Sequence, residues 1–232
     1  MTTYLDMLAE MGVDGAHPGG FDLTKNILRK LKIDCHTALL DVGCGTGQTA
    51  AYIAEQYGAD VTAIDIHPIM LAKAKDRFSS LTHPVHLRRA SVEALPFADG
   101  QFDIVLCESV LAFVSIPRAL AEIYRVLKQN GVLAAIEACH LQLTDKEKQK
   151  IAAFYGFRHL LTSQEWENEL QKKSFQHIDI TYSSASHPSA AQTPFLITAN
   201  MSLPILKMIE THQQMTKQYG DRLGYCVFSC QK

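Results

Sequence analysis

Short apolar runs alternate with segments of helical periodicity from residue 37 to residue 133. The runs that suit strands are 38–42, 59–65, 85–90, 103–108 and 132–138. The helical segments lie at 46–58, 68–78 and 117–128. Because strands that alternate with crossover-length helices form βαβ units, this pattern predicts a mostly parallel sheet with helices on both faces.

The pattern changes after Thr144. It predicts polar helices near 144–154 and 163–173, strands at 177–183 and 224–230, and a helix that starts at Ser202 and ends before Gly220. One face of that last helix carries Ile205, Leu206, Ile209, His212 and Met215. The interval 184–221 is rich in apolar residues, and we expect it to form a lid over an apolar substrate pocket. In the alternative interpretation, its helix only packs on the sheet.

A glycine-rich turn follows the first predicted strand directly. It reads Asp41-Val42-Gly43-Cys44-Gly45-Thr46-Gly47 and leads into a helix. Glycine lets a backbone turn sharply and approach a ligand, and the helix start offers unpaired N–H groups. Asp65 ends the next strand, where a carboxylate in a doubly wound sheet can accept both hydroxyls of a ribose. We interpret the pair as a nucleoside-cofactor site; the alternative is an ordinary turn beside a solvated aspartate.

The spacing of the glycines narrows the choice of cofactor. The chain has GxGxG rather than GxGxxG, and it has no GxxxxGK[ST]. An acid at position 41 repels phosphates but suits a ligand that carries an ammonium and a sulfonium group. The residues therefore argue against a dinucleotide and against a P-loop nucleotide.

Four stretches resemble the class I S-adenosylmethionine-dependent methyltransferases. They are LLDVGCGTG (39–47), VTAIDIHPIML (61–71), ASVEALPFADGQFDIV (90–105) and EIYRVLKQNGVL (122–133). The likeness is to the small-molecule branch that includes the ubiquinone/menaquinone C-methyltransferases, with its methyltransferase type 11 domain. It implies an α/β, Rossmann-like fold: a mostly parallel seven-stranded sheet with an antiparallel last strand, helices on both faces and a lid insertion. The implied parts are an N-terminal helical lid (1–36), a cofactor-binding core (37–140) and a C-terminal part of the same domain (141–232).

The resemblance also implies how the glycine turn would hold S-adenosylmethionine. The backbone of Gly43, Cys44 and Gly45 would pack on the methionine and ribose. Asp41 would meet the amino group directly or through water. Asp65 would accept the ribose hydroxyls.

Four further positions are implied to surround the adenine, and a fifth the reacting end. Ile66 and Met70 would flank the ring. The family's acid before the E-x-LPF run is Ser91 here, so adenine recognition would lean on the Val92 N–H. Glu108, at the end of the fourth strand, would lie at the junction of cofactor and substrate.

Two histidines and Glu108 are the candidate catalytic residues. His17 stands in His17-Pro18-Gly19-Gly20, where it is either a general base or hydrogen-bond donor in a lid, or an exposed residue in a turn. His140 follows the fifth strand and suits a general base for a hydroxyl or an acidic carbon; the alternative is a surface histidine. The fourth strand ends without the [DN]PP[YF] motif, which argues against nucleobase and amide acceptors. We therefore expect a small-molecule acceptor that reacts at O, C or N.

Two alternatives stay open. Cys44, Cys107 and Cys139 end strands that the fold makes neighbours, which suits a thiol- or metalloid-directed methyltransferase, unless the cysteines only fill buried space. In a different class, the chain is a non-catalytic module that senses the cofactor or binds a protein. No resident metal is predicted.

The composition of the chain limits which partners and which cellular location we expect. Lys plus Arg total 22 against 24 acidic residues, a formal net charge of −2, so no nucleic-acid partner is expected. The chain has no apolar run of about 18 residues for a membrane span, no basic signal-peptide start, and six cysteines without a CxxC pair. We expect a cytoplasmic monomer or homodimer that acts on a small, partly apolar substrate.

Overall fold

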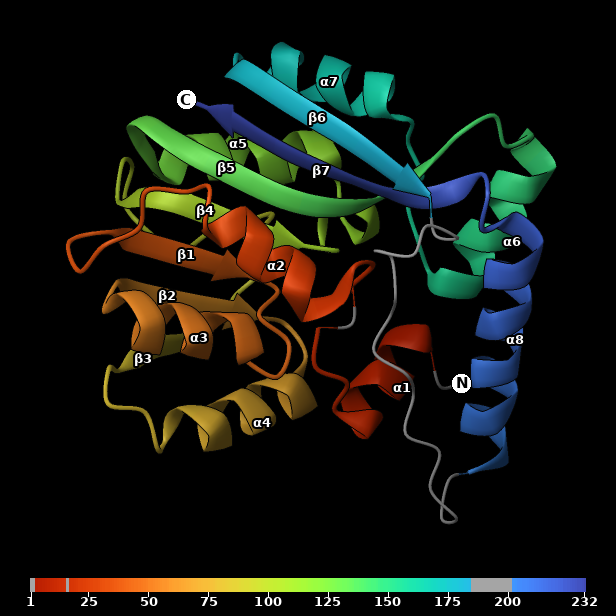
Figure 1. The fold of residues 1–232 in the computed structure, drawn as a ribbon, viewed down its shortest axis with the longest axis horizontal. Helices are drawn as coiled ribbons and strands as arrows, with labels where there is room; N and C mark the ends of the chain where they lie inside the picture. The colour runs from red at the N-terminus through yellow and green to blue at the C-terminus, as the bar shows by residue number, and fades with distance from the viewer. Residues whose placement is uncertain (1–2, 16, 185–201) are drawn as a thin grey trace.

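The computed structural model is built on a central sheet with helices on both faces (Figure 1). It describes residues 3–15, 17–184 and 202–232. The strand order is β3-β2-β1-β4-β5-β7-β6. The strands are β1 (Ala38–Val42), β2 (Asp60–Asp65), β3 (Val85–Arg89), β4 (Phe102–Glu108), β5 (Leu127–His140), β6 (Gln176–Ser184) and β7 (Leu223–Gln231). Within the described sheet, β7 runs opposite to the other six strands, which confirms the predicted fold class.

Helices connect most of the strands, and two further helices precede the first strand in the chain. They are α1 (Tyr4–Met11), α2 (Gly20–Leu28), α3 (Gln48–Tyr57), α4 (Pro68–Phe78), α5 (Ile116–Val126), α6 (Asp145–Tyr155), α7 (Ser163–Lys172) and α8 (Leu203–Tyr219), with a short 3₁₀ helix η1 (Leu111–Phe113). Pro68 occupies the first turn of α4, where its missing N–H removes no helical hydrogen bond. The helices predicted in the first half of the chain are confirmed to within a few residues.

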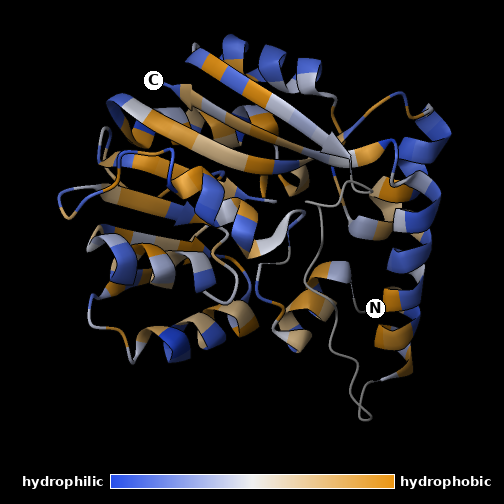
Figure 2. Ribbon diagram, in the orientation of Figure 1, coloured by the Kyte–Doolittle hydropathy of each residue, from blue (hydrophilic) through white to orange (hydrophobic). Residues whose placement is uncertain are grey.

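The core has two layers because alternate residues of a strand face opposite sides of a sheet. Leu40 and Val105 pack with Ile123 of α5 on one face. Leu39 and Leu106 pack with apolar residues of α2 and α3 on the other. Figure 2 shows the central strands as largely hydrophobic, as expected for strands buried on both faces.

The fifth strand is longer than the sequence predicts. It begins at Leu127, which pairs with Phe102 of β4, rather than at Val132. Asn130 takes a left-handed conformation (φ 63°), and the register of the pair shifts between Phe102 and Ile104. Asn tolerates that conformation, so residues 130–131, which lie between the predicted helix and the predicted strand, form an irregularity inside a continuous strand.

The end of the predicted lid interval packs on the N-terminal helix. Ile205 and Ile209 of α8 form a cluster with Met7 and Leu8 of α1. Figure 1 shows α8 beside α1 at one edge of the molecule. The stretch 185–201 of the predicted lid lies outside the described residues.

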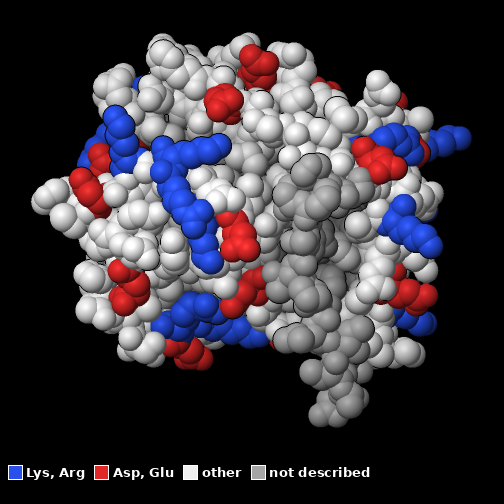
Figure 3. Space-filling model, in the orientation of Figure 1, with Lys and Arg blue, Asp and Glu red and all other residues white. Residues whose placement is uncertain are grey.

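The surface carries mixed charge. Figure 3 shows basic and acidic side chains interspersed on the face drawn. None of the helices that the structure describes is both long enough and apolar enough to cross a membrane.

Candidate functional site

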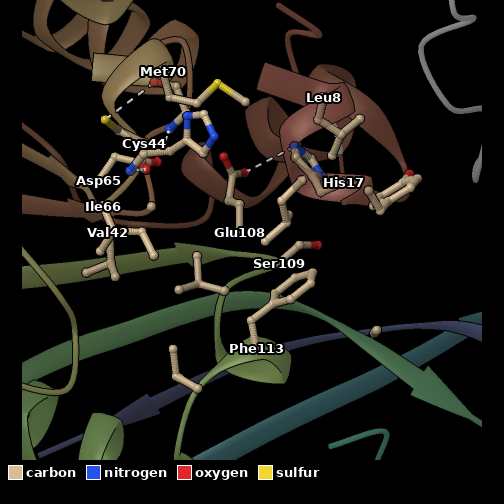
Figure 4. Close-up of a pocket in the computed structure, with 18 of the residues that line it drawn as sticks. Leu8, His17, Val42, Cys44, Asp65, Ile66, Met70, Glu108, Ser109 and Phe113 are labelled. Atoms are coloured by element: carbon tan, nitrogen blue, oxygen red, sulfur yellow. Dashed lines mark hydrogen bonds and ion pairs between the residues drawn. The ribbon is translucent and has the colours of Figure 1, made fainter. Parts of the chain in front are cut away.

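A cavity of about 400 Å³ opens at the carboxyl ends of β1, β2 and β4. β1 lies between β2 and β4, so this is where the strand order reverses and where open α/β sheets bind ligands. The N-terminal segment covers the cavity from the other side: α1 contributes Tyr4, Leu5 and Leu8 to its lining. Figure 4 shows the residues around it.

The glycine turn after β1 forms one wall. The N–H groups of Gly43 and Cys44 both donate to the Ile64 carbonyl, at 2.8 and 2.9 Å. Gly43 has φ +69°, and a Cβ added there would lie 2.4 Å from Cγ2 of Val110. Position 43 therefore needs glycine both for its backbone conformation and for its contact with the loop after β4.

Asp65 is fixed beside this turn. Its Oδ2 accepts the Gly45 N–H at 3.0 Å, and its Oδ1 accepts the His67 N–H at 2.7 Å. Burial raises the pKa of this carboxyl, and the backbone donors oppose that shift. A carboxylate has about four acceptor positions, so two remain for hydroxyl donors of a ligand.

The residues predicted around the adenine line the same part of the cavity. Ile66, Met70, Ser91 and Val92 all contribute to its wall. Ile66 is 60% exposed, which is unusual for so apolar a side chain. The Ser91 hydroxyl oxygen accepts the Glu93 N–H at 3.2 Å. The hydrogen of the Ser91 hydroxyl is therefore not used in this contact.

Three carboxylates make this region strongly acidic. Asp41 is buried, and burial raises its pKa well above the ordinary value, helped by the charges of Glu108 and Asp65. Its Oδ2 has no hydrogen-bond partner within the described part of the chain. Asp41 does not itself line the cavity. A ligand with net positive charge near the three groups would relieve their mutual repulsion, and the ammonium and sulfonium groups of S-adenosylmethionine fit this requirement.

His17 and Glu108 meet at the centre of the cavity wall. Nε2 of His17 lies 3.5 Å from Oε1 of Glu108, and both side chains are almost fully buried (Figure 4). Oε1 also accepts the Thr24 hydroxyl at 2.5 Å, and Oε2 accepts the Thr49 hydroxyl at 2.8 Å. The exposed-turn alternative for His17 is therefore wrong, because the ring is buried under the N-terminal segment.

Aromatic rings form the remaining wall. They belong to α1, η1, α6, the loop after α6, and α8: Tyr4, Phe113, Tyr155, Phe157 and His212. The centroids of Tyr4 and Tyr155 are 4.9 Å apart in an edge-to-face contact, and Phe113 meets Phe157 at 5.1 Å. Of these five residues, only His212 lies in an interval that the sequence predicts to cover the substrate, the lid interval 184–221. The other rings carry no local signal, because each is a single apolar residue in a separate element.

The structure does not bring His140 into the cavity. β5 extends as far as His140, its last residue, which pairs with Leu223 of β7, so His140 belongs to the strand and not to a loop beyond it. The residue is buried, and it is absent from the cavity lining. Burial, and then the charge of Lys148, lowers its pKa. The prediction of His140 as a catalytic base is corrected on this ground.

The three cysteines are not gathered at the cavity either. Cys44 lines it, but Cys107 and Cys139 are completely buried in the sheet. A hydrogen bond with Cys226, and then burial, raises the pKa of Cys139. Across the described ranges, no group of three or more His, Cys, Asp or Glu residues could hold a metal ion. The arrangement favours the filler interpretation of Cys107 and Cys139.

Comparisons with known proteins identify the family of the chain. Residues 40–135 match a family described as a methyltransferase domain. The whole chain is 38% identical over 234 residues to the uncharacterized methyltransferase YodH of Bacillus subtilis (strain 168), with 100% of both chains covered. The chain belongs to the class I S-adenosylmethionine-dependent methyltransferases. The match does not single out the ubiquinone/menaquinone branch of this methyltransferase family.

Solved structures share the fold of this methyltransferase. Phosphoethanolamine N-methyltransferase 2 of Haemonchus contortus, in complex with S-adenosyl-L-methionine, superposes with a TM-score of 0.83 at 19% identity, over 98% of this chain and 57% of that one. The [4+2]-cyclase SpnF superposes with a TM-score of 0.75 at 22% identity, over 98% and 92% of the two chains. Because a cyclase has this fold, the fold alone does not fix the reaction.

The acidic cluster predicts a pH dependence of cofactor binding. A cation beside Asp41 favours its ionised form, whereas burial in the free protein favours the protonated form. Binding should therefore release a proton, and the Kd for S-adenosylmethionine should fall as pH rises from about 5 to 7, below the range in which the ligand's amino group titrates. Calorimetry in two buffers of different ionisation enthalpy measures this release. An Asp41→Asn variant should release less, and equal release by both proteins would contradict the assignment to Asp41.

Proposed function

We propose that this methyltransferase acts on a small acceptor with an aromatic or otherwise apolar body, held beside the cofactor in one shared cavity. The observation that carries the proposal is the division of that cavity. One part is formed by the glycine turn and Asp65, and the other by aromatic rings. In Figure 4, Glu108 and His17 lie between Asp65 and Leu8 of α1.

The first part suits the cofactor through residues that are already held in place. Asp65 would accept the ribose hydroxyls, and the backbone at Gly43, Cys44 and Gly45 would pack on the ribose and methionine. Ile66, Met70, Ser91 and Val92 would surround the adenine, and Asp41 would balance the positive charge. S-adenosylmethionine, when bound, supplies a methyl group on a good leaving group, the sulfonium. The protein has mainly to align the acceptor and exclude water.

The second part suits an apolar acceptor. Tyr4, Phe113, Tyr155 and Phe157 offer ring faces and edges, which bury apolar surface with defined geometry. Arg158 also lines the cavity, and its side chain remains 60% exposed. An acceptor with an apolar body would be enclosed by the rings, and an acidic end could reach the arginine.

The thiol- or metalloid-directed alternative has less support. That alternative needs Cys107 and Cys139 near the methyl group of the cofactor, and both side chains are completely buried in the sheet. The non-catalytic module differs from the proposed enzyme in one measurable respect, because it would bind the cofactor without turnover.

An acceptor screen tests the proposal. The protein is incubated with S-adenosylmethionine and a panel of phenols, quinol-like rings, small thiols and amines, and S-adenosylhomocysteine is quantified. We expect product with an apolar ring-bearing acceptor, and a KM for that acceptor about 10-fold higher in Phe113→Ala, because the variant loses a buried aromatic contact. The Kd for the cofactor should stay within about 2-fold, since Phe113 is assigned to the acceptor. Turnover only with thiols would favour the alternative acceptor class, and binding without any turnover would favour the module.

A further inference from the structure

Thr24 joins His17 and Glu108 into one hydrogen-bonded chain. The Thr24 oxygen lies 3.1 Å from Nε2 of His17 and 2.5 Å from Oε1 of Glu108. Thr24 is completely buried in α2 and does not line the cavity, whereas His17 and Glu108 do. The Thr24 hydroxyl therefore connects these two cavity residues from a buried position outside the cavity.

The donors and acceptors in this chain fix the number of protons it holds. Nδ1 of His17 lies 3.1 Å from the Pro18 carbonyl, and a carbonyl only accepts, so Nδ1 carries a hydrogen. If Nε2 is bare and Glu108 is ionised, the single Thr24 hydrogen must serve two acceptors. One additional proton satisfies every contact. It can reside on Glu108, which then donates to Thr24, or on His17, which then donates to Thr24 while Thr24 donates to Glu108.

We propose that His17, Thr24 and Glu108 form a proton relay that takes up the proton lost by the methyl acceptor. This rests on the proposed function and deepens it, because a relay is needed only where the reacting atom bears a proton. The acceptor class is therefore a hydroxyl, a thiol, a protonated carbon acid or an N–H group, and a tertiary amine is excluded.

The proton balance of the step is complete within the site. The bond between the acceptor atom and its hydrogen breaks, and the proton goes to a free lone pair of Glu108. A new bond forms between the acceptor atom and the methyl carbon, and the carbon–sulfur bond breaks with its electron pair left on sulfur. Thr24 then passes a proton from Glu108 to Nε2 of His17, which leaves an imidazolium 3.5 Å from a carboxylate. The loaded relay has all its hydrogen bonds satisfied, which favours proton uptake.

The neighbouring groups act on the relay from other elements. Thr49 of α3 donates to the second oxygen of Glu108. Besides His17, Asp41 of β1 and the Cys107 thiol of β4 also interact with Glu108 electrostatically. None of the three contacts His17 through a hydrogen bond recorded among the described residues. Removing the Thr24 hydroxyl should therefore break the hydrogen-bonded link between His17 and Glu108 and leave only their direct 3.5 Å contact.

Nitrogen NMR of the free protein, labelled at histidine, tests the relay without turnover. The His17 signals are identified by their loss in His17→Gln. In Thr24→Val the pH at which the ring becomes an imidazolium should fall by about 0.5 or more, since the variant keeps the shape but loses the hydroxyl. Thr24→Ser should restore the wild-type behaviour. Thr49→Val is the matched control, and it should shift the His17 signals less than Thr24→Val does.

Cofactor titration separates this proposal from the proposed function. Wild type and Thr24→Val should bind S-adenosylmethionine with Kd values within about 3-fold, because Thr24 is outside the cavity. If both bind and their His17 signals change at the same pH, the relay is wrong and the methyltransferase assignment stands. If folded wild type does not bind, the proposed function fails. Should Thr24→Val not fold, Glu108→Gln must lower the same His17 transition, and an unchanged transition would overturn the relay.

Discussion

Replacing Glu137 by alanine should destabilise the protein by about 3–5 kcal/mol, because the change leaves a set of buried donors without a partner. Glu137 is fully buried in β5. Its Oε1 accepts the N–H groups of Val110 and Leu111 at 3.0 and 2.8 Å, and its Oε2 accepts that of Ala112 at 3.2 Å. One carboxylate thus holds the start of η1, the element that carries Phe113 into the cavity.

Urea unfolding of wild type, Glu137→Ala and Glu137→Gln measures this effect. The glutamine keeps one acceptor oxygen but directs an amide donor at the remaining N–H, so its loss should be intermediate. A free-energy loss below about 1 kcal/mol for the alanine variant would contradict the account. Since the same change releases Phe113, the acceptor KM should rise in both variants.

The difference in the free energy of unfolding between wild type and Glu137→Gln should change with pH in a direction that the pKa of Glu137 determines. Burial raises the pKa of Glu137 from 4.5 to about 7, against the opposing effect of the backbone donors. A carboxyl whose pKa is higher in the folded protein contributes stability below its unfolded value and loses that contribution as pH rises through the folded value. The stability advantage of wild type over Glu137→Gln should therefore shrink between about pH 5 and 8. An advantage that grows over this range would show that the backbone donors outweigh burial.

Replacing Asp65 by alanine should weaken S-adenosylmethionine binding by at least about 10-fold. The ribose would lose two hydrogen bonds to a charged acceptor, each worth about 1.5–3 kcal/mol. The variant also frees the Gly45 and His67 N–H groups, which the carboxylate holds in place. Both effects act in the same direction on cofactor affinity.

Asp60→Ala is the matched control for this variant. Asp60 begins the strand that Asp65 ends, and its side chain is 67% exposed. Its Oδ1 lies 3.6 Å from Nε2 of His86 at the surface, a contact that contributes little. We expect Asp60→Ala to bind the cofactor like wild type in calorimetric titration. Unchanged affinity in folded Asp65→Ala would remove Asp65 from the cofactor site.

The cofactor part of the cavity could be predicted from the sequence because its residues stand at or just after the ends of predicted strands. The glycines at 43–47 follow β1 directly, Asp65 is the last residue of β2, and parallel strands bring their carboxyl ends to one edge. The structure places Gly43, Asp65, Ile66 and Met70 around one cavity, as expected. Their contacts with a bound cofactor remain a prediction.

The acceptor part could not be predicted in the same way. Tyr4, Phe113 and Tyr155 come from three elements far apart in the chain, and only tertiary packing brings their rings together. Thr24 has no sequence signal either, since its role depends on two partners from other elements. His140 was placed wrongly because the length of β5 is set by pairing with β7, which periodicity does not reveal.

Calorimetric titration of the folded protein with S-adenosylmethionine and S-adenosylhomocysteine tests the central claim most directly. The two ligands share the adenosine and amino-acid parts that the glycine turn and Asp65 would hold. The account predicts micromolar binding of both, with the positively charged ligand gaining more affinity as pH rises, because only it carries the sulfonium charge beside the acidic cluster. No detectable binding of either ligand by a demonstrably folded protein would contradict it.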